Sequence, residues 1–154
     1  MRIAFSATVI GVLLLGLALD VTPGLGQIVV VVSRSNSTND LTLADLEALY
    51  LGRRTSFANG APAVLGEYRP ARRSFYRSVL DLSESAVSRH WIGVVFSEGS
   101  ALPPKAFQDA EAARRFVLST PGAICFIDLD SVRDDVKVLT IGGLGPRDHA
   151  YPLH

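Results

Sequence analysis

The chain has 154 residues, with 15 basic and 15 acidic side chains, one cysteine and a hydrophobic fraction of 48%. This length corresponds to one ordinary domain, and the hydrophobic fraction excludes a disordered chain. The single cysteine excludes an intramolecular disulfide bond and a zinc site built from four cysteines. The net charge of zero gives no whole-chain argument for nucleic acid or an anionic membrane as a partner.

The N-terminal segment has the pattern of an export signal. Arg2 precedes an almost purely apolar run, Ile3–Leu19, and Thr22-Pro23-Gly24 would break a helix after it. Gly24 and Gly26 stand at the spacing that a signal peptidase prefers. The alternative is an uncleaved membrane anchor, for which the run is short against a hydrocarbon core of ~30 Å. We expect a signal peptide over 1–26, a domain over 27–154, and a periplasmic or secreted protein. No cysteine lies near the cleavage point, so a lipoprotein is excluded.

Strand and helix patterns alternate from residue 27 onward. Gln27–Ser33 is a continuous β-branched run, typical of a strand buried on both faces. Further strand patterns cover 63–65, 123–127 and 136–141. Helix patterns begin after the N-cap residues Thr42, Ser83 and Asp109 and at Pro70.

Apolar side chains at helical spacing predict which helix faces are buried. The side chains expected to face inward are Leu43, Leu46, Leu49, Tyr50, Phe75, Val79, Leu80, Val87, Trp91, Val94, Val95, Ala113, Phe116 and Val117. The order of elements, β-α-β-α-α-α-β-β, predicts one three-layer α/β domain.

A basic cluster stands out from this neutral chain. It consists of Arg53, Arg54, Arg69, Arg72, Arg73 and Arg77, with Glu67 as the one acid in that range. If Pro70 begins a helix, the free amides of its first turn and the guanidinium groups of Arg69, Arg72 and Arg73 favour a bound oxyanion. Ser74 adds a hydroxyl group there. The alternative is a solvated basic face whose partner is Glu67 or an acid elsewhere.

The loop after the first strand is a second candidate site. Ser33 and Ser35 carry hydroxyl groups at the carboxyl end of that strand, where ligands collect in open α/β sheets. Their hydroxyl groups could hydrogen-bond a small oxyanion. Loops of this composition are also ordinary turns.

Catalytic and metal-binding patterns are weak. Cys125 lies within an apolar strand, which predicts a buried, inert thiol. His90 borders the apolar face of its helix, and His149 and His154 lie in the tail. The acidic residues after 127 lack the pattern of a calcium loop. The sequence therefore predicts no catalytic residue, metal site or cofactor.

An ordered set of motifs resembles the phosphate-type periplasmic solute-binding proteins. The matching segments are Thr42–Leu46, Tyr50–Thr55, Asn59–Pro62, Phe75–Leu80, Trp91, Phe96 and Thr120–Ile127. The resemblance implies a three-layer α/β/α single lobe of a type-2 periplasmic binding protein, with a mixed, mostly parallel sheet. It also implies phosphate or another oxyanion as ligand, and an ABC permease or another periplasmic protein as partner.

The chain departs from that family in two respects. The family carries an anion loop resembling Arg-Ser-Asp-Gly-Ser-Gly-Thr, whereas this chain has Arg69-Pro70-Ala71-Arg72-Arg73-Ser74, so that only Arg69 and Ser74 carry over. A two-lobed clamshell also needs roughly 250 residues, and this chain supplies one lobe.

Two functional hypotheses follow. The first is an exported, non-enzymatic protein that binds phosphate or another small oxyanion in connection with ABC transport. Its ligand-binding residues would be Arg69, Arg72, Arg73, Ser74, Ser33 and Ser35. The second is a single-lobe interaction or adaptor module in the periplasm, which has lost the ligand and presents a basic face to a partner or to a copy of itself. Neither requires nucleic acid.

Overall fold

The structure is a computed structural model that describes residues 26–97 and 99–154. All but the last residue of the expected signal peptide lies outside the described residues. The strands are β1 (Ile28–Ser33), β2 (Asp40–Leu41), β3 (Val64–Tyr68), β4 (Lys105–Phe107), β5 (Ala123–Asp128), β6 (Val136–Val138) and β7 (Thr140–Ile141). The helices are α1 (Leu43–Tyr50), α2 (Arg72–Leu80), α3 (Glu84–Phe96) and α4 (Ala110–Ser119), with the 3-10 turns η1 (Arg69–Ala71) and η2 (Leu129–Ser131).

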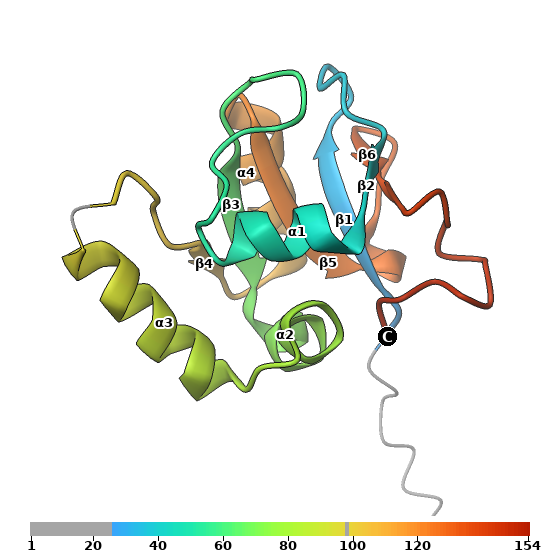
Figure 1. The fold of residues 1–154 in the computed structure, drawn as a ribbon. Coiled ribbons are helices and arrows are strands. Elements are labelled where there is room, and N and C mark those ends of the chain that lie inside the picture. Colours follow the sequence, from blue (N-terminus) through green and yellow to red (C-terminus); the bar gives the residue numbers. More distant parts are fainter. Residues whose placement is uncertain (1–25, 98) are drawn as a thin grey trace, which may run out of the picture.

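The main sheet has five strands in the order β4-β3-β5-β1-β6 (Figure 1). β3 pairs in parallel with β4 and β5, whereas β1 is antiparallel to both β5 and β6. Four strands therefore run in one direction and β1 runs against them. This confirms the mixed, mostly parallel sheet. The short strands β2 and β7 form a separate parallel pair.

Helices cover both faces of the sheet, which makes the three expected layers. Alternate residues of β1 point to opposite sides because the side-chain period of a strand is two. Val29 and Val31 join a core with α4, whereas Val30 and Val32 join a larger core with α1, α2 and α3. All four of these valines are fully buried, which confirms the prediction for this strand. The tail also contributes to the larger core, through Tyr151 and Leu153.

The expected helix caps are present. The Thr42 hydroxyl accepts a hydrogen bond from the Asp45 amide, and the Asp45 carboxylate accepts one from the Thr42 amide, so that α1 begins with a capping box. Ser83 and Asp109 accept the equivalent amide hydrogen bonds at the start of α3 and α4.

The structure differs from the sequence-based expectations in three places. The expected strand 136–141 is divided, because the Leu139 amide donates to the Val30 carbonyl whereas the next amide, of Thr140, donates to Asn39 beside β2. The strands β2 and β4, of two and three residues, were not predicted. Leu43 and Val95 are exposed rather than inward-facing.

Candidate functional site

The predicted anion-binding turn joins β3 to α2. Pro70 does not begin the α-helix itself. It lies in the 3-10 turn η1, and α2 begins at Arg72. Neither η1 nor α2 has a side-chain cap. The first amides of this turn therefore receive no side-chain oxygen, and they form the positive end of the helix dipole.

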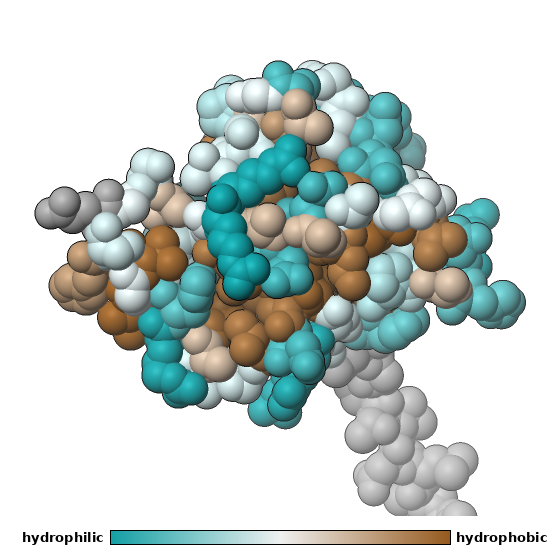
Figure 2. Space-filling model, viewed as in Figure 1, coloured by the Kyte–Doolittle hydropathy of each residue, from teal (hydrophilic) through white to brown (hydrophobic). Residues whose placement is uncertain are grey.

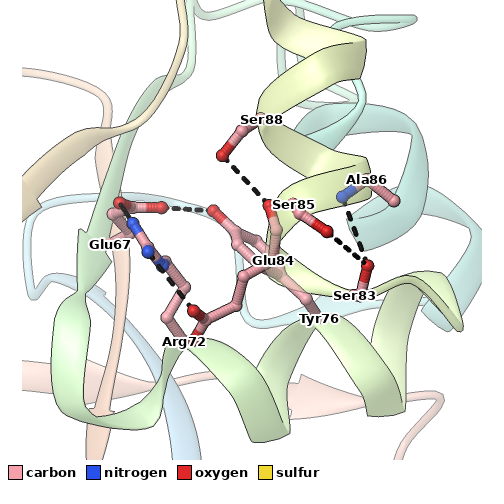
Figure 3. A network of polar contacts seen from close by, with 8 residues as sticks. All are labelled: Glu67, Arg72, Tyr76, Ser83, Glu84, Ser85, Ala86 and Ser88. Carbon is pink, nitrogen blue, oxygen red and sulfur yellow. Dashed lines mark hydrogen bonds and ion pairs between the residues drawn. The ribbon is translucent and has the colours of Figure 1, made fainter.

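Arg72 is held by two carboxylates of the chain itself (Figure 3). Its guanidinium nitrogens lie 3.1 Å from a carboxylate oxygen of Glu67 and 3.4 Å from one of Glu84. The second carboxylate oxygen of Glu67 accepts a hydrogen bond from the Tyr76 hydroxyl. This group of four residues is called the Glu67 network below.

The Glu67 network is charged and largely shielded from water. Glu67 is the one buried charged side chain among the residues that the structure describes. Partial burial lowers the pKa of Arg72, but the hydrogen bonds and charges of Glu67 and Glu84 raise it overall, so the guanidinium stays protonated. Burial also raises the pKa of Tyr76, with a further contribution from the charge of Glu67. Tyr76 therefore remains a hydrogen-bond donor.

The other predicted residues of this turn lie around the network. Arg69 and Arg73 are exposed, and Ser74 is half-buried. Arg73 lines a shallow hollow of about 370 Å³, together with Arg77, Ser83, Glu84 and Ser85. The structure thus places Arg73 toward the start of α3. Of the three predicted arginines, Arg72 is engaged by carboxylates and the other two face solvent.

Ser33 and Ser35 lie at the opposite end of the sheet. β1 runs antiparallel to β5, and β5 runs parallel to β3, so the carboxyl end of β1 lies beside the amino ends of both. The carboxyl end of β3, where Arg69 follows, is about 15 Å away along the strands. The two serines share a hydrogen bond of 2.9 Å and line a separate hollow of about 370 Å³ whose other lining residues are uncharged, some polar and some apolar. The structure does not bring them together with the arginines.

Two apolar surface features were not predicted from the sequence. The first is a hollow of about 640 Å³ beside the amino end of β3, whose lining includes Trp91, Leu102 and Phe116. The second is the outer face of α3, where Ile92, Val95 and Phe96 are exposed. Figure 2 shows hydrophobic surface over α3. The sequence predicts an inward orientation for Val94 and Val95 and no orientation for Ile92 and Phe96, so it does not predict this exposed face.

The residues considered for catalysis have structural roles. Cys125 is fully buried, and burial raises the pKa of its thiol. His90 makes a hydrogen bond of 2.7 Å with the Leu51 carbonyl, which ties α3 to the end of α1. Within residues 26–97 and 99–154, no three His, Cys, Asp or Glu side chains are grouped so as to hold a metal ion. No helix in these ranges is long and apolar enough to span a membrane.

Comparison with known proteins adds information about the fold. The sequence matches no protein-family model, and it matches no curated protein. Among solved structures, the chain is similar to a protein from Clostridium perfringens, assigned as a phosphate ABC transporter substrate-binding protein and determined with bound phosphate. The TM-score is 0.63, the identity is 19%, and the match covers 79% of this chain and 47% of that one.

Two further structures give the same result. An ABC-type phosphate transport receptor from Vibrio cholerae matches with a TM-score of 0.55 and 16% identity, over 79% of this chain and 48% of that one. PstS from Borrelia burgdorferi matches with a TM-score of 0.56 and 14% identity, over 79% and 49%. The chain spans about half the length of these proteins. It therefore has the α/β fold of a single lobe of the phosphate ABC transporter substrate-binding proteins.

Proposed function

We propose that this chain is a non-enzymatic binding lobe that acts by contact with a protein surface rather than by enclosing phosphate. The observation that carries the proposal is the Glu67 network, because Glu67 supplies to Arg72 the oxygen atoms that a bound oxyanion would supply. An anion that used Arg72 would have to displace Glu67 and Glu84 and would then lie beside their negative charges. The proposed non-enzymatic role agrees with the similar structures, which are described as substrate-binding proteins and receptors.

The surface of α3 supports the same proposal. The exposed apolar face of α3 supplies a surface suited to protein contact.

Calorimetric titration with phosphate and with sulfate tests the proposal. We expect no heat of binding for the wild-type chain at up to about 1 mM anion. Glu67→Gln removes the internal carboxylate and keeps its shape, so this variant should acquire binding, which Arg72→Ala in the same background removes. Arg53→Ala is the control, since Arg53 belongs to an exposed ion pair on another part of the basic cluster. Tight phosphate binding by the wild type that Arg72→Ala abolishes would overturn the proposal.

A second candidate is weak oxyanion binding at the surface of the same turn. It is favoured by the uncapped start of α2 and by the exposed guanidinium groups of Arg69 and Arg73, with the Ser74 hydroxyl nearby. With this weak surface binding, the chain would still have a phosphate-like ligand and a link to ABC transport. Nuclear magnetic resonance should then show phosphate-dependent shifts of the amides of residues 71–74 that Arg69→Ala weakens. Uniform shifts over the whole surface would count against it.

We also propose that the chain is exported and that it contacts an ABC permease or another periplasmic protein, a second copy of this chain included. The support is the sequence of residues 1–26 together with the fold. N-terminal sequencing of the protein from its native cells should begin at Gln27. A first residue of Met1 would contradict cleavage.

A further inference from the structure

The helix α3 carries large apolar side chains on two opposite sides. Val87 and Trp91 are buried against the body of the protein, as is usual for an amphipathic helix. On the opposite side, Ser85, Arg89, Ile92 and Phe96 follow one another at intervals of four, three and four residues, which places them in one stripe. The exposed fractions are 58% for Ile92 and 83% for Phe96.

Gly93 lies beside this stripe and leaves a gap in the helix surface. Apart from its chain neighbours and the backbone of its own helix, no atom of the described residues lies within 4 Å of the position that a Cβ atom would take at Gly93. Glycine within a helix is destabilising relative to alanine. No contact of the described residues explains the glycine, whereas a small residue on an outer face allows the backbone of another helix to approach closely.

The stripe and the gap at Gly93 would fit the same surface of another α3 helix. We propose that α3 pairs with the α3 helix of a second copy of this chain. The pair is antiparallel, with the two-fold axis passing between positions 92 and 93. On one side of the axis the two Ile92 side chains meet, and on the other side the two Gly93 residues let the helices approach. Away from the axis, Arg89 of each copy lies against Phe96 of the other.

The charge on the face fits this arrangement. Arg89 is the one charged residue of the stripe, and within the described part of the chain it makes no ion pair or hydrogen bond. In the proposed register its guanidinium lies over an aromatic ring, which is a favourable cation–π contact. The two Arg89 side chains are about 10 Å apart along the helices, so their repulsion is screened. In a two-fold symmetric contact, the same surface of each copy must supply both partners of every interaction. The α3 face does so, because it carries both Arg89 and Phe96.

This inference rests on the proposed function, because it names the partner that the protein-contact surface takes. The test is sedimentation equilibrium of the purified chain from about 1 to about 500 μM, where we expect a monomer–dimer equilibrium. Phe96→Lys places a cation against Arg89 and should weaken dimerisation at least about tenfold. The double variant Arg89→Glu with Phe96→Lys exchanges the charges and should restore it.

Two further variants separate dimerisation from folding. Gly93→Gln should raise the thermal stability of the monomer at low concentration, because glutamine favours helix more than glycine, and should weaken the dimer by filling the gap. Leu118→Ser, at an exposed apolar residue of α4, is the control and should leave the equilibrium unchanged.

Two outcomes would overturn the dimer. One is a wild-type chain that remains monomeric across the concentration range. This outcome includes the case in which the monomer binds a different protein through α3. The other is a dimer that Phe96→Lys and Gly93→Gln do not affect. Neither result overturns the proposed function, as long as the chain does not bind phosphate. Tight phosphate binding through Arg72 overturns the proposed function, whether the chain is a monomer or a dimer.

Discussion

The guanidinium of Arg72 lies 3.1 Å from the carboxylate of Glu67, although the two residues belong to different elements, α2 and β3. This contact and the one with Glu84 balance the positive charge of Arg72 at the start of α2. An acidic partner within the chain was one of the two interpretations that the sequence left open. The positive end of α2 thus faces a carboxylate that the fold itself supplies.

Removing one partner of this ion pair should lower the free energy of unfolding. Arg72→Met leaves the buried Glu67 carboxylate with the Tyr76 hydroxyl but without its cation, and we expect a loss of about 2–3 kcal/mol in the free energy of unfolding. The measurement is urea denaturation followed by circular dichroism. Arg53→Met is the matched control. Arg53 pairs with Glu47 in an exposed setting, so its loss should be within about 0.5 kcal/mol. Equal losses for the two variants would show that the Glu67 pair contributes no more than an exposed one.

The capping box of α1 should make stability depend on pH. The hydrogen bond from Thr42 lowers the pKa of Asp45 below its ordinary value of 3.8, with a smaller contribution from the charge of Arg54. A carboxyl whose pKa is lowered by folding stabilises the protein above the unfolded pKa, and this contribution is lost as the pH falls through the folded pKa.

Asp45→Asn should therefore cost about 1 kcal/mol of unfolding free energy at neutral pH. The difference from wild type should shrink as the pH falls below 3.8. Thermal melts at a series of pH values measure it. Glu111→Gln, at an exposed ion pair on α4, serves as the control for the loss of one surface carboxylate. A difference that stays constant down to the lowest pH would mean that the Asp45 charge contributes nothing.

Local features could be predicted from the sequence because their causes are local. The caps of α1, α3 and α4 depend on one side chain and an amide three residues later. The first strand follows from its β-branched run. The two- and three-residue strands β2 and β4 carry no such pattern, because they exist only through pairing with β7 and β3, which are distant in the sequence.

The candidate site could be predicted only in part, because it depends on strand direction and on tertiary contacts. The sequence showed that Ser33 ends a strand and that Arg69 comes after another. It did not show that β1 runs against β3, which separates the two residues. In the same way, the nearest acid, Glu67, was identified as a candidate partner, whereas the approach of Glu84 from α3 depends on the packing of two helices.

The contact between the start of β5 and the segment before β3 should tolerate no side chain at Gly122. This residue has a φ of 77°, and a Cβ atom there would lie 2.1 Å from the Pro62 carbonyl oxygen. Gly60 has a similar φ of 84°, but apart from its chain neighbours no atom of the described residues lies within 4 Å of its Cβ position. Gly60→Ala should therefore cost about 1–2 kcal/mol from backbone strain alone. Gly122→Ala should cost clearly more, because the backbone at Pro62 must also move. Chemical denaturation of both variants decides this, and equal losses would show that the loop at Pro62 adjusts freely.

The thiol of Cys125 should report on unfolding of the central sheet. Cys125 is fully buried in β5, and burial raises the pKa of its thiol, so that the reactive thiolate is scarce and inaccessible in the folded protein. We expect a thiol reagent to label the native chain only through opening of the sheet, and to label it rapidly in concentrated urea. The logarithm of the labelling rate should rise in Arg72→Met and Gly122→Ala in proportion to their loss of stability, because labelling through global opening follows the population of the open state. Rapid labelling of the native wild type, unaffected by these substitutions, would show that β5 opens locally and that the sheet is not held as one unit.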